Sequence, residues 1–421
     1  MIVNTILLKE TLYYSFSKAI PGVVGFFSVI IFMRMAGSSE YGEYSFLLSQ
    51  CNLIVALGYG WLNQAQLRYF SLDNHQNHYI NNQIRALISS FLFCLLILSI
   101  LVLIQSLSML IWIISIITIA SMGIFNYLKT LYQVKILPKK IVFQTSFQSL
   151  LGLLLALALM QLIGTSKISL LLGLTLSFII TILIIIRNKT KILSSFFRNY
   201  KKNDNQISYL RKWFIYGSPL SLWFAIGLAL SYLDRFFINY YLTSFDLGIY
   251  ASIQELLIRS FSLTLFPFIM ALHPRIMNLW NKSMTKDAVR LILNSIFLII
   301  IVGITLSFFV WQYDDLIFIG IKKIIPEVMF QSKRLILPLF FSGFFWQLSF
   351  LTHKMLELNE QTKSMIIAII PSLIINIIGN IYFLPKIGVL ATAYTAFFSA
   401  LIYCIITSIY SIYLINKMKP V

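Results

Sequence analysis

The sequence predicts an all-α polytopic membrane protein, with about 12 transmembrane helices in two six-helix pseudo-repeat lobes around a central cavity. Three observations predict it: an apolar composition, a series of span-length apolar stretches, and basic residues concentrated on alternate loops. Of the 421 residues, 59% are hydrophobic and 11% are charged, against about 45–50% and 25% in ordinary soluble domains. This composition excludes a soluble globular enzyme, a disordered chain and a coiled coil.

Stretches long enough to cross a bilayer recur along the whole chain. A transmembrane helix needs about 20 mostly apolar residues, and in lipid an open chain satisfies its backbone polar groups only as a helix. The separation of the third stretch from the fourth rests on the short polar break at 105–108. The expected spans are 11–35, 43–63, 84–105, 108–128, 141–163, 168–187, 213–240, 247–272, 288–312, 333–353, 364–384 and 388–414.

The basic residues predict the orientation, because Lys and Arg are enriched in cytoplasmic loops. If the N-terminus is cytoplasmic, 23 of the 33 basic residues fall on the inner side and 8 on the outer side, while Lys18 and Arg259 fall inside spans. This bias predicts an even number of spans and both termini in the cytoplasm. The basic residues of the cytoplasmic loops also explain most of the net charge of +19. No nucleic-acid partner is needed to explain it.

The two halves of the chain share a short motif. Residues 40–44 (EYGEY) and 246–250 (DLGIY) both read acidic-x-Gly-x-Tyr between the first and second spans of a half, at an offset of 206 residues. Repeats of six spans are parallel and related by an axis along the membrane normal. We therefore expect an N-terminal lobe at 1–187, a basic cytoplasmic linker at 188–212 and a C-terminal lobe at 213–421. Two such lobes are typical of transporters.

Arg259 is the clearest candidate for function, because an ionisable group in the hydrocarbon costs about 2.5–3.5 kcal/mol on insertion scales. It lies 11 residues beyond Gly248, which is roughly 16 Å along a helix and near the middle of a ~30 Å core. Glu255 precedes it by one turn, in the order that favours an ion pair. One interpretation is a pair that locks two helices. The other, which we favour, is a polar stripe that lines a cavity.

Other polar residues fall at several depths of the expected spans. A ladder of cations at Lys18, Arg259 and Arg235 would attract anions such as phosphates or acidic sugars. These residues also have structural interpretations. Lys18 could snorkel to the lipid headgroups, and Asp234 could pair with Arg235 at the membrane interface. The other polar residues could form hydrogen bonds between packed helices. The candidate substrate-binding residues are Lys18, Arg34, Ser49, Asn52, Arg235 and Arg259, and the candidate ion-coupling residues are Asp234 and Glu255.

Signatures of catalysis and of cofactor or metal binding are absent from the sequence. There is no G-x-x-x-x-G-K-[ST] loop that would bind ATP phosphates, and none of the four histidines has a metal-ligand partner spacing within a plausible site. Cys51, Cys94 and Cys404 lie in apolar runs and are expected to be small buried hydrophobes. We therefore expect neither an enzyme nor a bound cofactor or metal.

Several short motifs together resemble a known family. The run 34–44 (RMAGSSEYGEY), Gly217-Ser218-Pro219, the pair at 234–235, the segment 248–251 (GIYA) and the segment 385–388 (PKIG) resemble the polysaccharide transporter family. Its members are Wzx-type flippases of O-antigen or capsule repeat units, within the multidrug/oligosaccharidyl-lipid/polysaccharide exporter superfamily. The resemblance covers most of the chain.

The resemblance implies a function, a location and partners. An undecaprenyl-diphosphate-linked oligosaccharide would move from the inner to the outer leaflet of the bacterial cytoplasmic membrane by alternating access, coupled to protons or sodium. Membrane lipids and other polysaccharide assembly proteins are further expected partners, and nucleic acid is not. Few basic residues are intramembrane, so a neutral repeat unit is an open alternative. The competing functions are a drug or small-molecule exporter of the same superfamily and, less favoured because no outer loop is long enough for catalysis, a membrane glycan polymerase.

Overall fold

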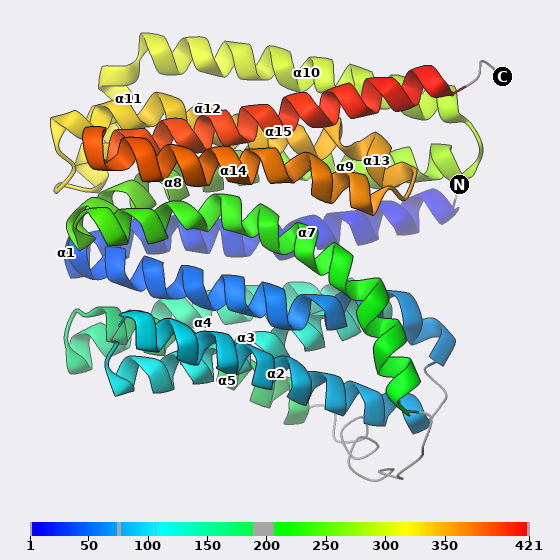
Figure 1. Ribbon diagram of the computed structural model, residues 1–421, viewed down its shortest axis with the longest axis horizontal. Coiled ribbons are helices and arrows are strands. Elements are labelled where there is room, and N and C mark those ends of the chain that lie inside the picture. Colours follow the sequence, from blue (N-terminus) through cyan, green and yellow to red (C-terminus); the bar gives the residue numbers. More distant parts are fainter. Residues whose placement is uncertain (1, 74–76, 106, 188–205, 419–421) are drawn as a thin grey trace. The chain divides into compact units, whose positions relative to one another are not determined.

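The computed structural model describes residues 2–73, 77–105, 107–187 and 206–418, which are almost entirely helical and contain no strand (Figure 1). Ten of the described helices are long and apolar enough to cross a membrane, so the all-α, multi-pass prediction is confirmed. The helices are α1 (Ile2–Asp73), α2 (Asn77–Gln105), α3 (Met109–Val134), α4 (Pro138–Ile163), α5 (Lys167–Arg187), α7 (Gln206–Tyr241), α8 (Ser244–Thr264), α9 (Phe266–Asn281), α10 (Thr285–Gln312), α11 (Asp314–Ile324), the 3₁₀ helix η1 (Phe330–Leu335), α12 (Ile336–Thr352), α13 (Lys354–Leu358), α14 (Thr362–Ile387) and α15 (Val389–Lys417).

Two of the expected spans lie in α1, which explains part of the difference between ten helices and about 12 spans. The stretches 11–35 and 43–63 are joined through Gly37, whose φ of 80° and ψ of 169° break the helical geometry. Glycine adopts this positive φ without the steric cost that other residues meet. The expected span 247–272 falls instead on α8 and α9, which meet at Leu265. Neither helix alone has the length and hydropathy of a span.

The chain divides into two compact units. Unit 1 comprises residues 1–15, 22–46 and 226–421, and unit 2 comprises residues 16–21 and 47–225. In unit 1, α15 packs along both α12 and α14, and α8 and α10 pack on α12. The expected division into lobes at 1–187 and 213–421 stays a prediction, and most of the expected linker (188–205) lies outside the described residues.

Unit 2 contains two of the three cysteines in its apolar core. Cys51 and Cys94 are 1% and 0% exposed and pack in one cluster with Tyr59, Phe125 and Phe178. Cys404, in unit 1, is also buried, and all three thiols are free. The prediction that the cysteines are small buried hydrophobes is confirmed.

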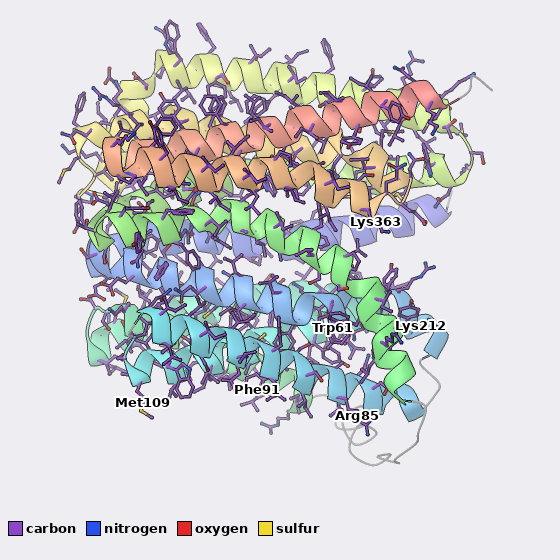
Figure 2. All side chains as sticks on the ribbon, in the orientation of Figure 1. Trp61, Arg85, Phe91, Met109, Lys212 and Lys363 are labelled. Atoms are coloured by element: carbon purple, nitrogen blue, oxygen red, sulfur yellow. The ribbon has the colours of Figure 1, made fainter. Side chains whose placement is uncertain are left out.

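The N-terminal part of α7, which belongs to unit 2, packs on the second half of α1. Trp213 and Trp61 belong to one buried cluster, and the Lys212 ammonium lies 4.8 Å from the centre of the Tyr69 ring. Figure 2 labels Trp61 and Lys212 on these two helices. A cation over an aromatic face is stabilising, so this contact helps to fix the start of α7.

In unit 1, the two copies of the acidic-x-Gly-x-Tyr motif pack against each other. A Cβ atom at Gly248 would lie 1.8 Å from the carbonyl oxygen of Ser38, and one at Gly42 would lie 2.2 Å from that of Ser244 and 2.7 Å from the amide nitrogen of Gly248. Both glycines are therefore required by a backbone-to-backbone crossing of α1 and α8. The acidic residue of the second motif has a different role: Asp246 and Thr243 form a reciprocal capping box at the start of α8.

Replacing Gly248 by alanine should destabilise the protein, because the new methyl group would overlap backbone atoms that cannot rotate away. Overpacking of this kind costs about 1–3 kcal/mol. We expect a lower thermal midpoint for the detergent-solubilised G248A protein, measured by tryptophan fluorescence. The matched control is Gly320→Ala on α11, where a Cβ would meet nothing within 4 Å. Equal midpoints for G248A and G320A would contradict the close crossing.

Candidate functional site

One glutamate is shared by two arginines in unit 1. Arg235 Nη2 lies 2.9 Å from Glu255 Oε1, and Arg259 Nη2 lies 2.8 Å from Glu255 Oε2. Arg235 comes from α7, and Glu255 and Arg259 lie one turn apart on α8. We call these three residues the arginine–glutamate cluster. Since it combines two guanidinium groups with one carboxylate, it carries one net positive charge.

The two arginines of this cluster differ in access. The Arg235 side chain is only 2% exposed, its Nη1 donates to the carbonyl oxygen of Ser45 at 3.3 Å, and its guanidinium lies 5.0 Å from the Tyr232 ring centre. The Arg259 side chain is 32% exposed, while Glu255 is 17% exposed. Arg235 is therefore held on several sides, whereas Arg259 is the member whose guanidinium an outside anion can reach.

Gly25 on α1 makes room for the Arg259 guanidinium. A Cβ atom at Gly25 would lie 1.7 Å from Arg259 Nη1 and 2.5 Å from its Cζ. The guanidinium thus lies against the bare backbone of α1 within unit 1. Gly25 is not among the residues predicted from the sequence, although a glycine one turn beyond Pro21-Gly22 in an apolar span is a signal of close approach.

Asp234, next to Arg235 in sequence, has other partners. The Tyr250 hydroxyl donates to its Oδ2 at 2.5 Å, and the amides of Asn376 and Asn380 donate to its Oδ1 at 2.9 and 3.3 Å. Asp234 and both asparagines are 0% exposed. We call these four residues the Asp234 cluster. The expected interfacial pair of Asp234 with Arg235 is replaced by two separate buried arrangements.

Further oxygen atoms of α14 and α15 lie buried without a hydrogen-bond partner in the described part of the chain. They are Asn380 Oδ1, Ser372 Oγ and Thr392 Oγ1. Buried polar atoms rarely stay unpaired, because each costs about 1–3 kcal/mol. The buried Asp234 carboxylate, with the side-chain amides of Asn376 and Asn380 beside it, offers oxygen atoms suited to a proton or a small hard cation. The polar line Ser372, Asn376 and Asn380 is recognisable in the sequence at i, i+4, i+8, but its partner on α7 is not.

The other predicted site residues lie apart from these clusters or have contacts of their own. Arg34 donates to the carbonyl oxygens of Lys323 and Ile324, at 2.5 and 2.7 Å, so it binds the C-terminal end of α11. In unit 2, Lys18 is exposed, Ser49 is buried and Asn52 is half-buried. The ladder that would join Lys18 to Arg259 and Arg235 stays a prediction. Within the described chain there is no group of three or more His, Cys, Asp and Glu side chains placed to hold a metal ion.

Comparison with known proteins gives a fold. No protein-family model and no curated protein matches the chain, whereas several solved structures resemble it over nearly its full length. An inward-facing multidrug resistance MATE transporter of the MOP superfamily superposes with a TM-score of 0.66 at 10% identity, covering 97% of this chain and 96% of that one.

Two further structures show the same similarity. The lipid II flippase MurJ, in an inward closed conformation, gives a TM-score of 0.68 at 15% identity, covering 96% of this chain and 87% of its own. A mutant of the Vibrio cholerae MATE transporter VcmN gives 0.66 at 10% identity, covering 100% and 99%. The chain therefore has the fold of these MATE transporter and MurJ flippase structures, and it is a multi-pass membrane protein.

Replacing Glu255 by glutamine should destabilise unit 1, because it leaves the guanidinium of Arg235 buried without its counter-charge. Breaking a buried ion pair by removing one partner costs about 3–5 kcal/mol, and the partial exposure of Arg259 favours the lower end. We expect E255Q to melt below the wild type by tryptophan fluorescence. Glu360→Gln, at an exposed position, is the matched control. An unchanged E255Q midpoint would mean that the glutamate does not neutralise Arg235.

Proposed function

We propose that this protein is a flippase that moves undecaprenyl-diphosphate-linked oligosaccharide repeat units, of O-antigen or capsule type, from the inner to the outer leaflet of the bacterial cytoplasmic membrane. The observation that carries the proposal is the arginine–glutamate cluster, with one net positive charge inside membrane helices. Its partly exposed member, Arg259, is suited to a diphosphate because a planar guanidinium binds phosphate oxygens in a bidentate manner. The orientation rests on the basic-residue bias, with both termini cytoplasmic.

Transport would proceed by alternating access, in which the substrate site faces each side of the membrane in turn. The Asp234 cluster is our proposed coupling site, for a proton or a sodium ion. Tyr250, Asn376 and Asn380 hold the carboxylate with neutral donors, so the site can gain or lose one positive charge without breaking an ion pair. Glu255, the other expected coupling residue, is already neutralised by two arginines and is less suited to that role.

A drug or small-molecule exporter is the second candidate, and the fold shared with a multidrug resistance MATE transporter favours it. Cationic drugs bind accessible carboxylates. Here Asp234 is fully buried and Glu255 is less exposed than Arg259, so the accessible charge has the opposite sign. This difference is why we prefer an anionic substrate. Membrane lipids and other polysaccharide assembly proteins are its proposed partners.

Deleting the gene should cause lipid-linked oligosaccharide to accumulate on the cytoplasmic leaflet. Complementation with Arg259→Ala should restore export poorly, by about tenfold or more below wild type, because a charge-assisted hydrogen bond contributes about 1.5–3 kcal/mol. Surface glycan and inner-leaflet lipid-linked glycan measure the two effects. Normal export in a deletion strain with no redundant transporter would overturn the flippase assignment.

Two further variants separate a binding role of Arg259 from a structural one. Gly25→Ala keeps the charge but displaces the guanidinium, so it should reduce export while the protein is still inserted at wild-type level. Arg275→Ala removes an exposed arginine of α9 and should leave export unchanged. Equal export by R259A and R275A strains would remove Arg259 from the site.

Asp234→Asn should abolish the dependence of transport on an ion gradient, because an amide cannot exchange a proton and binds a cation weakly. The measurement is flipping of a fluorescent lipid-linked glycan in proteoliposomes under imposed proton or sodium gradients. The control is Asp287→Asn, at an exposed position in the first turn of α10. If D234N retains the wild-type response to both gradients, the coupling site lies elsewhere.

A further inference from the structure

Unit 1 contains a cavity of about 820 Å³ at the end where α11 lies. Its walls come from the start of α8, the end of α10, the segment from Met329 to Pro338, and the junction of α14 with α15. Figure 1 shows α11 at the end of the helices opposite the N- and C-terminal ends of the chain. A volume of this size is within the range of ligand-binding pockets, roughly 300–1,000 Å³.

Much of the cavity wall is apolar. Aliphatic side chains are contributed by Ile249, Leu335, Leu337 and Leu390, among others. Aromatic side chains line it as well, and Trp311 and Phe330 are 66% and 69% exposed. Such a wall suits a hydrocarbon chain better than a free sugar, which would leave its hydroxyl groups unpaired.

Of the charged side chains that line the cavity, one cation has no ion-pair partner among the described residues. Asp246 is engaged in the capping box of α8, and Lys333 contacts Asp314 and Asp315 at 2.8 and 2.6 Å. Arg334, also on the cavity wall, is exposed and makes no hydrogen bond or ion pair with the chain over its described ranges. After internal pairing, the cavity therefore presents a single guanidinium beside an apolar wall.

The neighbouring residues indicate that this cavity lies at the level of the lipid headgroups. Trp311 lies in the last turn of α10 and Tyr313 caps the end of that helix; they are 66% and 49% exposed, as in the aromatic belts of membrane proteins. On α11, Leu316 and Ile319 are exposed at 66% and 61%, and the helix ends in a pair of lysines. A short helix with an exposed apolar side and terminal lysines is typical of one that lies in the interface.

We propose that this cavity binds an anionic phospholipid from the leaflet on the α11 side, with the phosphate at Arg334 and an acyl chain along the wall formed by Leu337 and Leu390. The occupant is an amphiphile because the cavity combines one free cation with an apolar lining at headgroup depth. This is a site for a resident membrane lipid, separate from the arginine–glutamate cluster, and it does not depend on which substrate the protein transports.

Native mass spectrometry of the detergent-solubilised protein tests the site, with phosphatidylglycerol as the probe. Arg334→Gln should lower the bound phosphatidylglycerol at least threefold. Arg334→Lys should keep most of it because the charge is preserved. The matched control is Lys322→Gln, which removes an exposed cation of α11 that does not line the cavity and should leave binding unchanged.

The same experiment includes two competitors. Zwitterionic phosphatidylethanolamine should bind more weakly than phosphatidylglycerol, and excess inorganic phosphate should displace little of the bound lipid, because the apolar wall holds the chain. Equal binding of phosphatidylglycerol by R334Q and K322Q would overturn the proposal. Displacement by inorganic phosphate would also overturn it, by showing a site for free anions.

Discussion

The cost of placing charge inside a membrane is the constraint on which this structure depends. In unit 1, the side chains of Arg235, Arg259, Asp234 and Glu255 each have specific partners. Glu255 neutralises Arg235 and Arg259 together, while Asp234 is stabilised by three neutral donors. Neighbouring residues of α7 thus point to different partners, so this helix links α8 to α1 on one side and to α14 on the other.

The three charged residues Arg235, Arg259 and Asp234 differ in their burial and in their partners. Arg235 is enclosed and fixes helices, Arg259 is partly exposed, and Asp234 is enclosed and forms no ion pair with the described residues. Two glycines make the arrangement sterically feasible, since Gly25 leaves space for the guanidinium and Gly248 allows α1 and α8 to cross closely. The flippase that we propose would bind its diphosphate at Arg259 and its coupling ion at Asp234, and unit 1 contains both residues.

The sequence predicted the fold class and part of the site. Long apolar runs fix helices because lipid leaves the backbone no other partner, and the Glu255–Arg259 pair followed from i,i+4 spacing. The bridge from Arg235 could not be predicted, because it depends on how α7 packs on α8. The contacts of Arg34, a predicted substrate-binding residue, could not be predicted either, because its guanidinium binds carbonyl oxygens of α11, which lies far away in the sequence. The shared motif is recognisable in the sequence, but the contacts of its residues are not. In the structure, Asp246 caps α8, Gly248 allows α1 and α8 to cross closely, and Tyr250 donates a hydrogen bond to Asp234.

In the function that we propose, the partly exposed Arg259 guanidinium binds an anionic lipid-linked substrate. The most direct measurement is equilibrium binding of undecaprenyl diphosphate to the purified protein, with a cationic amphiphile of similar size for comparison, in wild type and in the Arg259→Ala variant. We expect that the diphosphate binds better than the cation and that the variant loses this preference. A wild-type protein that prefers the cationic amphiphile, or a variant that binds the diphosphate as well as wild type, would contradict it.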